Sequence, residues 1–260
     1  MKHNFISPWK HITQKKYIKL NIPKFPCSDY TIVNLSDIHL GYYLDKSFLE
    51  NLVKDVIDIS PNICVITGDL ISYNINLDIE ILSPLKYLTQ QIPTYFVVGN
   101  HEIGLYRSNI REFLDKLNIL GVHTLFNQST IIMQSKCIFN LVGVGDFIGE
   151  RFGVPMDIEK SFRDIDINLA TIVLIHRPNS IRFFQGYPFV LSLSGHNHGG
   201  QITKLGLLSS VIRNQGKFLI GLKEIEEGKF VYVSNGIGYS RIPFRLFAPS
   251  QIDVIKINNS

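Results

Sequence analysis

The sequence predicts an α/β protein in which two packed β-sheets are covered by helices on the outside. In the first half of the chain, apolar runs of strand length alternate with helical patterns in the order β-α-β-α-β-α. The second half is rich in strands, and its first two runs are expected to pair antiparallel. No linker interrupts the 260 residues, so one large domain is expected, with 1–29 as a basic N-terminal segment holding the first strand and 30–260 as the main domain.

The helix at 47–59 has the clearest pattern in the first half. Phe48, Leu52 and Val56 recur at helical spacing, and Ser47 followed by Glu50 three residues later forms a capping box. The neighbouring strands are short apolar runs that end in Gly-Asp or Gly-Asn. The expected elements are strands at 17–22, 31–35, 63–67 and 95–98 and helices at 47–59, 78–90 and 108–120.

The second half of the chain contains apolar and β-branched runs separated by turns. One short polar helix is expected near 179–185 between two of these runs. The expected strands lie at 130–133, 138–144, 169–175, 189–193, 230–233 and 252–257.

Composition excludes several classes of protein. Apolar residues make up 45% of the chain and charged residues 18%, which excludes global disorder. The longest apolar runs have the length of strands, so no membrane span is expected. Cys27, Cys64 and Cys137 lie far apart without a CxxC motif. This pattern predicts no disulfide scaffold and favours a reducing, cytoplasmic location.

Charge is distributed unevenly along the chain. Residues 1–30 carry six Lys against one Asp, and residues 200–260 carry eight Lys or Arg against four acidic residues. The central part, 31–199, is acidic, with twelve Lys or Arg against seventeen Asp or Glu. An acidic centre between basic ends suits a cation site flanked by surfaces that attract anions; ordinary solvated lysines are the alternative.

Polar clusters follow the predicted strands at the points where these end. In α/β sheets, ligands bind beyond the carboxyl ends of strands, so these clusters are expected to converge. Five of the eight histidines fall within them. The clusters are Asp37-Ile38-His39, Gly68-Asp69, Gly99-Asn100-His101-Glu102, His176-Arg177-Pro178 and Gly195-His196-Asn197-His198-Gly199-Gly200.

These clusters supply oxygen and imidazole donors and no thiolate. Such donors suit Mn²⁺, Fe or Zn²⁺, with Mn²⁺ preferred here, and they exclude a structural thiolate zinc site. Seven ligands are too many for one tetrahedral ion, so two divalent metal ions sharing a carboxylate are expected. The expected ligands are Asp37, His39, Asp69, Asn100, His176, His196 and His198.

The five clusters, in this order, resemble the motifs of calcineurin-like metallophosphoesterases. The resemblance covers roughly residues 30 to 257, and it is closest to the bacterial membrane-associated phosphodiesterase branch. That branch is similar to this chain in Ser36-Asp37-Ile38-His39-Leu40-Gly41, in Leu193–Gln201, and in Gly236-Ile237-Gly238 followed by Pro243-Phe244-Arg245.

The resemblance implies a four-layer α/β/β/α sandwich and a hydrolase with a binuclear metal centre. It assigns Asp37, His39, Asp69 and His198 to the first ion, and Asp69, Asn100, His176 and His196 to the second, with Asp69 bridging. The ions would orient hydroxide for in-line attack on a phosphodiester, phosphomonoester or pyrophosphate. His101 would be the catalytic residue that protonates the leaving oxygen. Arg177 and Arg245 are the expected substrate contacts, although a solvated surface charge is the alternative for Arg177.

Some positions depart from the family pattern. Members of the branch often carry Asp three residues after the bridging carboxylate, where this chain has Ser72. Since that carboxylate orients the catalytic histidine in some relatives, Glu102 or water is left to orient His101. All of the assigned metal ligands are present, so an active enzyme is expected.

The sequence is compatible with several substrates and partners. A lipid-linked phosphoester such as UDP-diacylglucosamine is one expectation. Exposed residues near 242–246 and the basic N-terminus would then dock peripherally on the anionic inner face of the membrane. The alternatives are a nuclease or nucleic-acid-binding protein and a metal-binding regulatory relative with little turnover. Recognition motifs for nucleic acid are absent, so no specific nucleic acid is expected.

Overall fold

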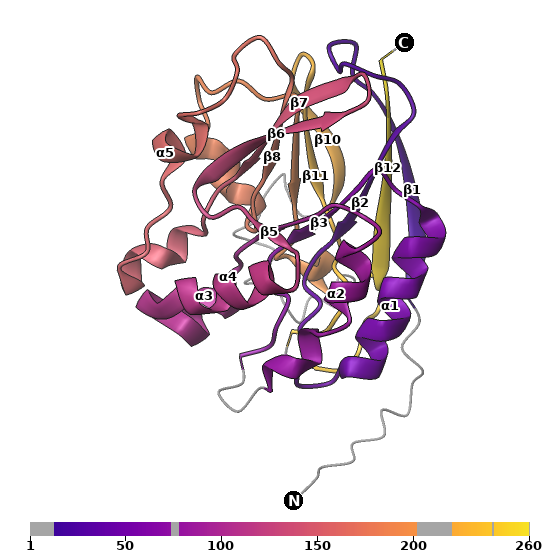
Figure 1. Ribbon diagram of the computed structural model, residues 1–260, viewed down its shortest axis with the longest axis vertical. Coiled ribbons are helices and arrows are strands. Elements are labelled where there is room, and N and C mark those ends of the chain that lie inside the picture. Colours follow the sequence, from indigo (N-terminus) through magenta and orange to yellow (C-terminus); the bar gives the residue numbers. More distant parts are fainter. Residues whose placement is uncertain (1–12, 74–77, 202–219, 241, 260) are drawn as a thin grey trace, which may run out of the picture.

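Two six-stranded sheets pack against each other in the computed structural model, which describes residues 13–73, 78–201, 220–240 and 242–259 (Figure 1). The first sheet has the order β1 (Gln14–Asn21), β12 (Gln251–Asn258), β2 (Tyr30–Leu35), β3 (Ile63–Thr67), β4 (Thr94–Val97) and β5 (His123–Thr124). The second has the order β10 (Gly221–Glu226), β11 (Lys229–Val233), β9 (Leu191–Ser194), β8 (Thr171–Leu174), β7 (Cys137–Gly143) and β6 (Gln128–Gln134).

Both sheets are mixed, and each has a parallel centre. Strands β2 to β5 run parallel in the first sheet, and β11, β9, β8 and β7 run parallel in the second. The antiparallel pairing expected for the runs near 130 and 140 is confirmed by β6 and β7. Strand β1 pairs with β12 along its whole length, so the N-terminal segment contributes an edge strand to the first sheet.

Helices cover the outer faces of both sheets and also occupy several of the connections. The α-helices are α1 (Lys46–Ile59), α2 (Leu85–Thr89), α3 (Asn100–Tyr106), α4 (Ile110–Ile119) and α5 (Ile158–Phe162). The 3₁₀ helices are η1 (Ile79–Leu82), η2 (Arg107–Asn109), η3 (Phe147–Phe152), η4 (Pro178–Phe183) and η5 (His198–Gly200).

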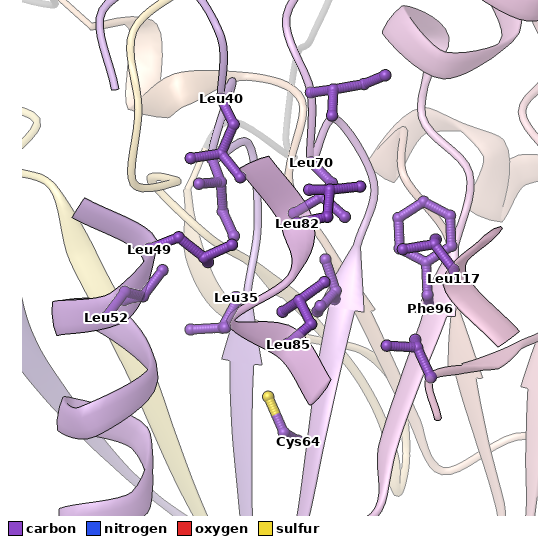
Figure 2. Packing of buried hydrophobic residues seen from close by; sticks show 14 of the residues in the cluster. Leu35, Leu40, Leu49, Leu52, Cys64, Leu70, Leu82, Leu85, Phe96 and Leu117 are labelled. Atoms are coloured by element: carbon purple, nitrogen blue, oxygen red, sulfur yellow. The ribbon is translucent and has the colours of Figure 1, made fainter. Parts of the chain in front are cut away.

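Three buried clusters hold the layers together. The first lies between the first sheet and α1, α2 and α4, where Leu49 and Leu52 of α1 belong to the same cluster as Leu35 of β2 (Figure 2). The second fills the space between the two sheets, and the third lies between the second sheet and the segments around α5 and η4. The order of layers is therefore helix, sheet, sheet, helix, as the sequence predicted.

Two helices differ from the sequence-based expectation for local reasons. Asp45, and not Ser47, caps α1, because its carboxylate accepts a hydrogen bond from the backbone N–H of Phe48 at 2.9 Å. The single helix expected over 78–90 is divided into η1 and α2. Pro84 separates them, since proline has no backbone N–H to continue the helical bonding pattern.

The structure contains one disulfide, which the sequence pattern did not predict. Cys27, in the connection after β1, forms a disulfide with Cys137 at the start of β7, with their Cα atoms 5.3 Å apart. The two residues are 110 positions apart, so only the stacking of the two sheets brings them together. Cys64 is buried and unpaired. The expectation of a reducing compartment rested on the absence of a disulfide scaffold, and this bridge weakens that support.

A buried polar network joins the two sheets. The carboxylate of Asp253 on β12 accepts hydrogen bonds from the Tyr232 hydroxyl at 2.7 Å, from Gln251 Nε2 at 2.6 Å and from Asn34 Nδ2 at 3.2 Å. Asn34 in turn accepts from the hydroxyl of Thr67 at 3.0 Å. Burial raises the pKa of Asp253 to about 6, although these donors oppose the shift.

None of the helices in the described ranges combines the length and apolar character that crossing a bilayer requires. The expected docking role of the basic N-terminus falls partly on residues 1–12, which lie outside the described residues.

Candidate metal centre

The polar clusters that follow the strands come together at one end of the stacked sheets. Asp37 and His39 follow β2, Asp69 follows β3, and Asn100 and His101 begin α3 after β4. From the second sheet, His176 follows β8, and His196 and His198 follow β9. The carboxyl ends of parallel strands in both sheets thus supply all seven expected ligands to one place.

A first group of donors is formed by Asp37, His39 and His198. The Nε2 atoms of His39 and His198 lie 3.0 Å apart, and Nε2 of His198 lies 3.4 Å from Oδ1 of Asp37. All three side chains are buried. Their donor atoms lie within 4.8 Å of one another.

A second group is formed by Asp69, Asn100, His176 and His196. Nε2 of His176 lies 3.2 Å from Oδ2 of Asp69, 3.2 Å from Oδ1 of Asn100 and 3.2 Å from Nδ1 of His196. Nδ1 of His176 donates to the carbonyl oxygen of Thr67 at 2.8 Å, which leaves Nε2 of this ring facing the group.

Asp69 connects the two groups. Its Oδ2 atom lies 3.2 Å from Nε2 of His176 and 3.7 Å from Nε2 of His39. One carboxylate oxygen therefore faces ligands of both groups, as a bridging ligand would.

Backbone groups hold both carboxylates in place. Asp37 accepts from the N–H of His196 at 2.9 Å and from the hydroxyl of Ser36 at 2.7 Å. Oδ1 of Asp69 accepts from the N–H of His101 at 2.9 Å. A side chain at Gly195 would collide with the carboxylate of Asp37, so this position requires the close backbone approach that only glycine allows.

The backbone of the site is unusual. Asp37, His39, Asp69, His196 and His198 all have positive φ angles between 50° and 67°. This left-handed region is costly for residues with a side chain, and such residues cluster at functional sites.

Burial and the two carboxylates shift the pKa values of the clustered histidines in opposite directions. Burial alone would lower the pKa of His176, but the carboxylates of Asp69 and Asp37 raise it to about 10. Burial opposes ionisation of Asp69 too, yet His176 and His101 hold the pKa of its carboxyl well below the usual value. Burial lowers the pKa of His39 to about 3 and also lowers those of His196 and His198, which keeps these imidazoles neutral as ligands must be.

The two groups fit divalent cations. Ligands about 2.1 Å from one ion and roughly 90–110° apart are separated by about 3.0–3.4 Å. The contacts His39–His198, His198–Asp37, Asp69–His176 and His176–His196 fall in this range. Neutral imidazoles beside buried carboxylates suit Mn²⁺, Fe or Zn²⁺ equally.

His101 lies at the open edge of the cluster. Its side chain is 21% exposed, and its Nε2 lies 3.8 Å from Oδ2 of Asp69. Nδ1 of His101 is buried, and within the described part of the chain it has no hydrogen-bond partner. Ser72 donates to the carbonyl oxygen of His39 at 2.7 Å, so its side chain is engaged elsewhere.

Glu102 does not have the expected role of orienting His101. Its buried carboxylate accepts from the backbone N–H groups of Gly99 at 2.8 Å and of Asp69 and Ile71 at 3.1 Å each. It therefore ties the turn after β3 to the turn after β4 and does not orient His101. Its position three residues after Gly99, in the first turn of α3, is the sequence feature that could have indicated this capping role.

Two arginines contact the histidines on the side away from the cluster. Nη1 of Arg177 lies 2.9 Å from Nε2 of His196, and Nε of Arg177 pairs with the buried carboxylate of Asp146 at 2.9 Å. Arg177 is thus an ion-paired residue at the site and not a solvated charge. Sequence reasoning missed Asp146, although Gly145-Asp146 after β7 repeats the pattern of Gly68-Asp69 after β3.

Arg245 is half-buried, and most of its donors are directed at backbone carbonyl groups. It donates to the oxygens of Gly238 and Asn235 at 2.8 Å each, and its Nη2 lies 3.1 Å from Nδ1 of His198. These contacts tie the segment after β11 to His198.

Comparison with known proteins identifies relatives of this chain. Residues 30–200 match the calcineurin-like phosphoesterase family. An uncharacterized metallophosphoesterase of Campylobacter jejuni is 34% identical over 93% of this chain and 62% of its own length. The zebrafish (Danio rerio) transmembrane protein with metallophosphoesterase domain is 29% identical over 94% of this chain and 57% of its own length. The phosphodiesterase YaeI of Escherichia coli is 27% identical, covering 80% of this chain and 75% of that protein.

The chain thus spans about three fifths of the length of the Campylobacter relative, and the family match covers both β2–β4 and β8–β9. The strand ends that carry the two donor groups accordingly lie inside the matched region. The chain belongs to the calcineurin-like phosphoesterases, a family of metal-dependent phosphoester hydrolases.

Proposed function

We propose that this domain hydrolyses a phosphodiester, phosphomonoester or pyrophosphate bond with two divalent cations. The observation that carries the proposal is the position of Asp69, whose Oδ2 faces His39 on one side and His176 on the other. Asp37, His39, Asp69 and His198 would hold the first ion, and Asp69, Asn100, His176 and His196 the second. When bound, two such ions supply Lewis acidity and an activated water for attack on phosphorus.

His101 is the proposed general acid. Its Nε2 lies at the exposed edge of the cluster, 3.8 Å from the Asp69 carboxylate, where a substrate's leaving oxygen can approach it. Since Nδ1 of the ring is buried, Nε2 is the atom that would hand a proton to the departing alkoxide. The backbone N–H of His101 bonds Asp69, so the start of α3 positions both residues together.

Of the two arginines, Arg177 remains the proposed substrate contact. Its side chain is 19% exposed and lies beside His196. For Arg245 the contacts support a positioning role on His198, because its guanidinium is occupied by carbonyl oxygens of the protein.

An apolar rim beside the cluster supports a substrate with an apolar group. Ile242, Phe244 and Phe247 are 52%, 37% and 53% exposed. Gln201, three residues after His198, donates to the carbonyls of Ile242 at 2.7 Å and Phe244 at 2.8 Å, which anchors the rim next to the ligands. A lipid-linked phosphoester, presented at a membrane surface, would place its head at the cations and its apolar part on this rim.

The experiment is a hydrolysis panel on protein whose metal content has been measured. It includes monoesters, diesters, cyclic nucleotides, a pyrophosphate, UDP-diacylglucosamine and single-stranded nucleic acid, each with Mn²⁺, Fe²⁺ or Zn²⁺. We expect turnover of at least one phosphoester, highest with Mn²⁺, and none of the nucleic acid. Protein that binds two ions and hydrolyses nothing in the panel would contradict the proposal.

The rim has its own test within the same panel. Phosphodiesters with short and long acyl chains are compared in wild type and in Phe244→Ser, with exposed Tyr87→Ser as the matched control. We expect the variant to lose the preference for long chains while keeping turnover of the short ones. An unchanged preference would remove the apolar substrate from the proposal.

A further inference from the structure

In the second donor group, the outer nitrogens of His176 and His196 contact chemically different partners. Metal-binding histidines usually direct their outer nitrogen to a carboxylate or a carbonyl oxygen. His176 follows this rule, with Nδ1 on the carbonyl of Thr67 at 2.8 Å. His196 does not, because its outer Nε2 faces Nη1 of Arg177 at 2.9 Å, and the carboxylate of Asp146 stands one step further away.

The pair of Asp146 and Arg177 is built rigidly into the fold. Nε of Arg177 lies 3.0 Å from Oδ1 and 2.9 Å from Oδ2 of Asp146, whose side chain is completely buried. Oδ1 of Asp146 also accepts from the N–H of Ile148 at 2.9 Å, which fixes the start of η3. The ring of Phe147 covers the guanidinium, 4.8 Å from its centre.

The charge of Arg177 has a direct consequence for a cation beside His196. A positive group this close opposes the binding of a second positive charge, and the effect is strong because the surroundings are buried. Asp146 neutralises the guanidinium by pairing with Nε, while Nη1 of the same group contacts His196. Without Asp146, the guanidinium beside His196 would be an uncompensated positive charge that repels a cation at the second position.

We propose that Asp146 neutralises Arg177 and that this neutral pair of positioning residues permits a cation to occupy the second position beside His196. The inference rests on the proposed two-cation site. It adds Asp146, which contacts neither substrate nor ions, and gives Arg177 a second role beside the proposed substrate contact. The first donor group has no contact with this pair among the described residues, so its affinity for a cation should not depend on Asp146.

The test measures Mn²⁺ binding to the full chain by isothermal titration calorimetry, with electron paramagnetic resonance reporting the spin coupling of paired ions. His39→Ala and Asn100→Ala each lack a ligand of one group only and so assign each binding step to a position. We expect Asp146→Asn to weaken the second Mn²⁺ about 10- to 100-fold and to abolish the coupling, with the first Mn²⁺ unchanged. Asp157→Asn, a capping carboxylate in the same connection, is the matched control and should bind like wild type.

The double variant Asp146→Asn/Arg177→Gln separates charge balance from a general structural effect. Because it also removes the guanidinium, we expect it to recover part of the affinity for the second Mn²⁺ that Asp146→Asn loses. Equal weakening of both ions, or a double variant weaker than Asp146→Asn, would overturn the inference.

Arg177→Lys keeps the inference testable if Asp146→Asn unfolds. The lysine keeps a positive charge beside Asp146 but loses the planar guanidinium that contacts both carboxylate oxygens. Because the charge is then less well neutralised, the second Mn²⁺ should bind several-fold more weakly while the first is unchanged. A second Mn²⁺ bound as in wild type would refute the role of the pair. Wild type that binds two coupled Mn²⁺ yet hydrolyses no phosphoester would instead count against the proposed function alone.

Discussion

Nε2 of His39 and Nε2 of His198 lie 3.0 Å apart, although 159 positions separate the two residues along the chain. Two neutral imidazole nitrogens at this separation have the spacing of neighbouring ligands around one ion. The contact exists because β2 of one sheet and β9 of the other end at the same edge of the sandwich. The candidate centre therefore depends on the packing of the two sheets as much as on its own side chains.

Asp69→Asn should remove most of the cation binding. The substitution keeps the size of the side chain but deletes the charge that both donor groups share, so we expect bound Mn²⁺ to fall below one ion per chain and kcat to fall at least about 1,000-fold. Elemental analysis and a phosphodiester assay measure the two effects. Asp253→Asn, which also replaces a buried acid between the sheets, is the control, and equal metal loss in both variants would contradict the assignment.

His101→Ala should slow turnover without releasing the cations. Loss of a general acid lowers kcat by about 100- to 10,000-fold, while the ligand groups stay intact. Steady-state kinetics and elemental analysis are run on the same preparation, with exposed His123→Ala as the control. Loss of one ion from His101→Ala would make this residue a ligand, since its Nε2 already lies 3.8 Å from Asp69.

Stability should fall as pH rises through the pKa of Asp253. Its folded-state pKa of about 6 is above the ordinary value of 3.8, so the folded protein binds the proton more tightly than the unfolded chain. This contribution is complete below about pH 4 and is lost as pH rises through about 6, on the order of 2 to 3 kcal/mol in all.

Denaturant unfolding between pH 4 and pH 8 measures that slope for wild type and Asp253→Asn. The variant cannot titrate at this position, so its free energy of unfolding should decline less over the same range. The exposed Asp115→Asn serves as the control and should retain the slope of wild type. Parallel curves for Asp253→Asn and wild type would exclude this carboxyl as the source.

The disulfide should stabilise the sandwich at the start of β7. The bridge closes a loop of 110 residues, and restricting such a loop in the unfolded chain is worth roughly 5 kcal/mol. Cys27→Ser/Cys137→Ser should lower the free energy of unfolding by about that amount in urea. Peptide mapping without reductant should recover the Cys27–Cys137 linkage, and three free thiols in denatured wild type would show that the bridge does not form.

The residues of the two donor groups could be predicted to lie together because each follows a strand in a short motif. Asp37 and His39, or His196 and His198, are neighbours in the chain, so local spacing already indicates a shared direction. The alternation of strands and helices likewise predicted the layers. Both the short motifs and the strand and helix patterns depend on residues that are close together in the sequence.

Other features depend on contacts that no local pattern reveals. Asp146 acquires its role only because β7 and β8 lie side by side and bring it to Arg177. Cys27 lies in a connection of the first sheet and Cys137 in β7 of the second, so their pairing depends on how the two sheets stack. Glu102 sits in a recognisable capping position, but its bonds to Asp69 and Ile71 require the adjacent strand β3.

Five of the candidate ligands have left-handed backbone, so the stability of the fold and the supply of metal donors are in conflict at these positions. Each such residue costs about 1 kcal/mol or more that glycine would not, and the packed sheets around it offset that cost. A glycine in place of His39 or His198 would relieve this strain while deleting a donor. Substitutions by glycine at these positions should therefore raise the stability of the fold while they remove donors from the candidate metal centre.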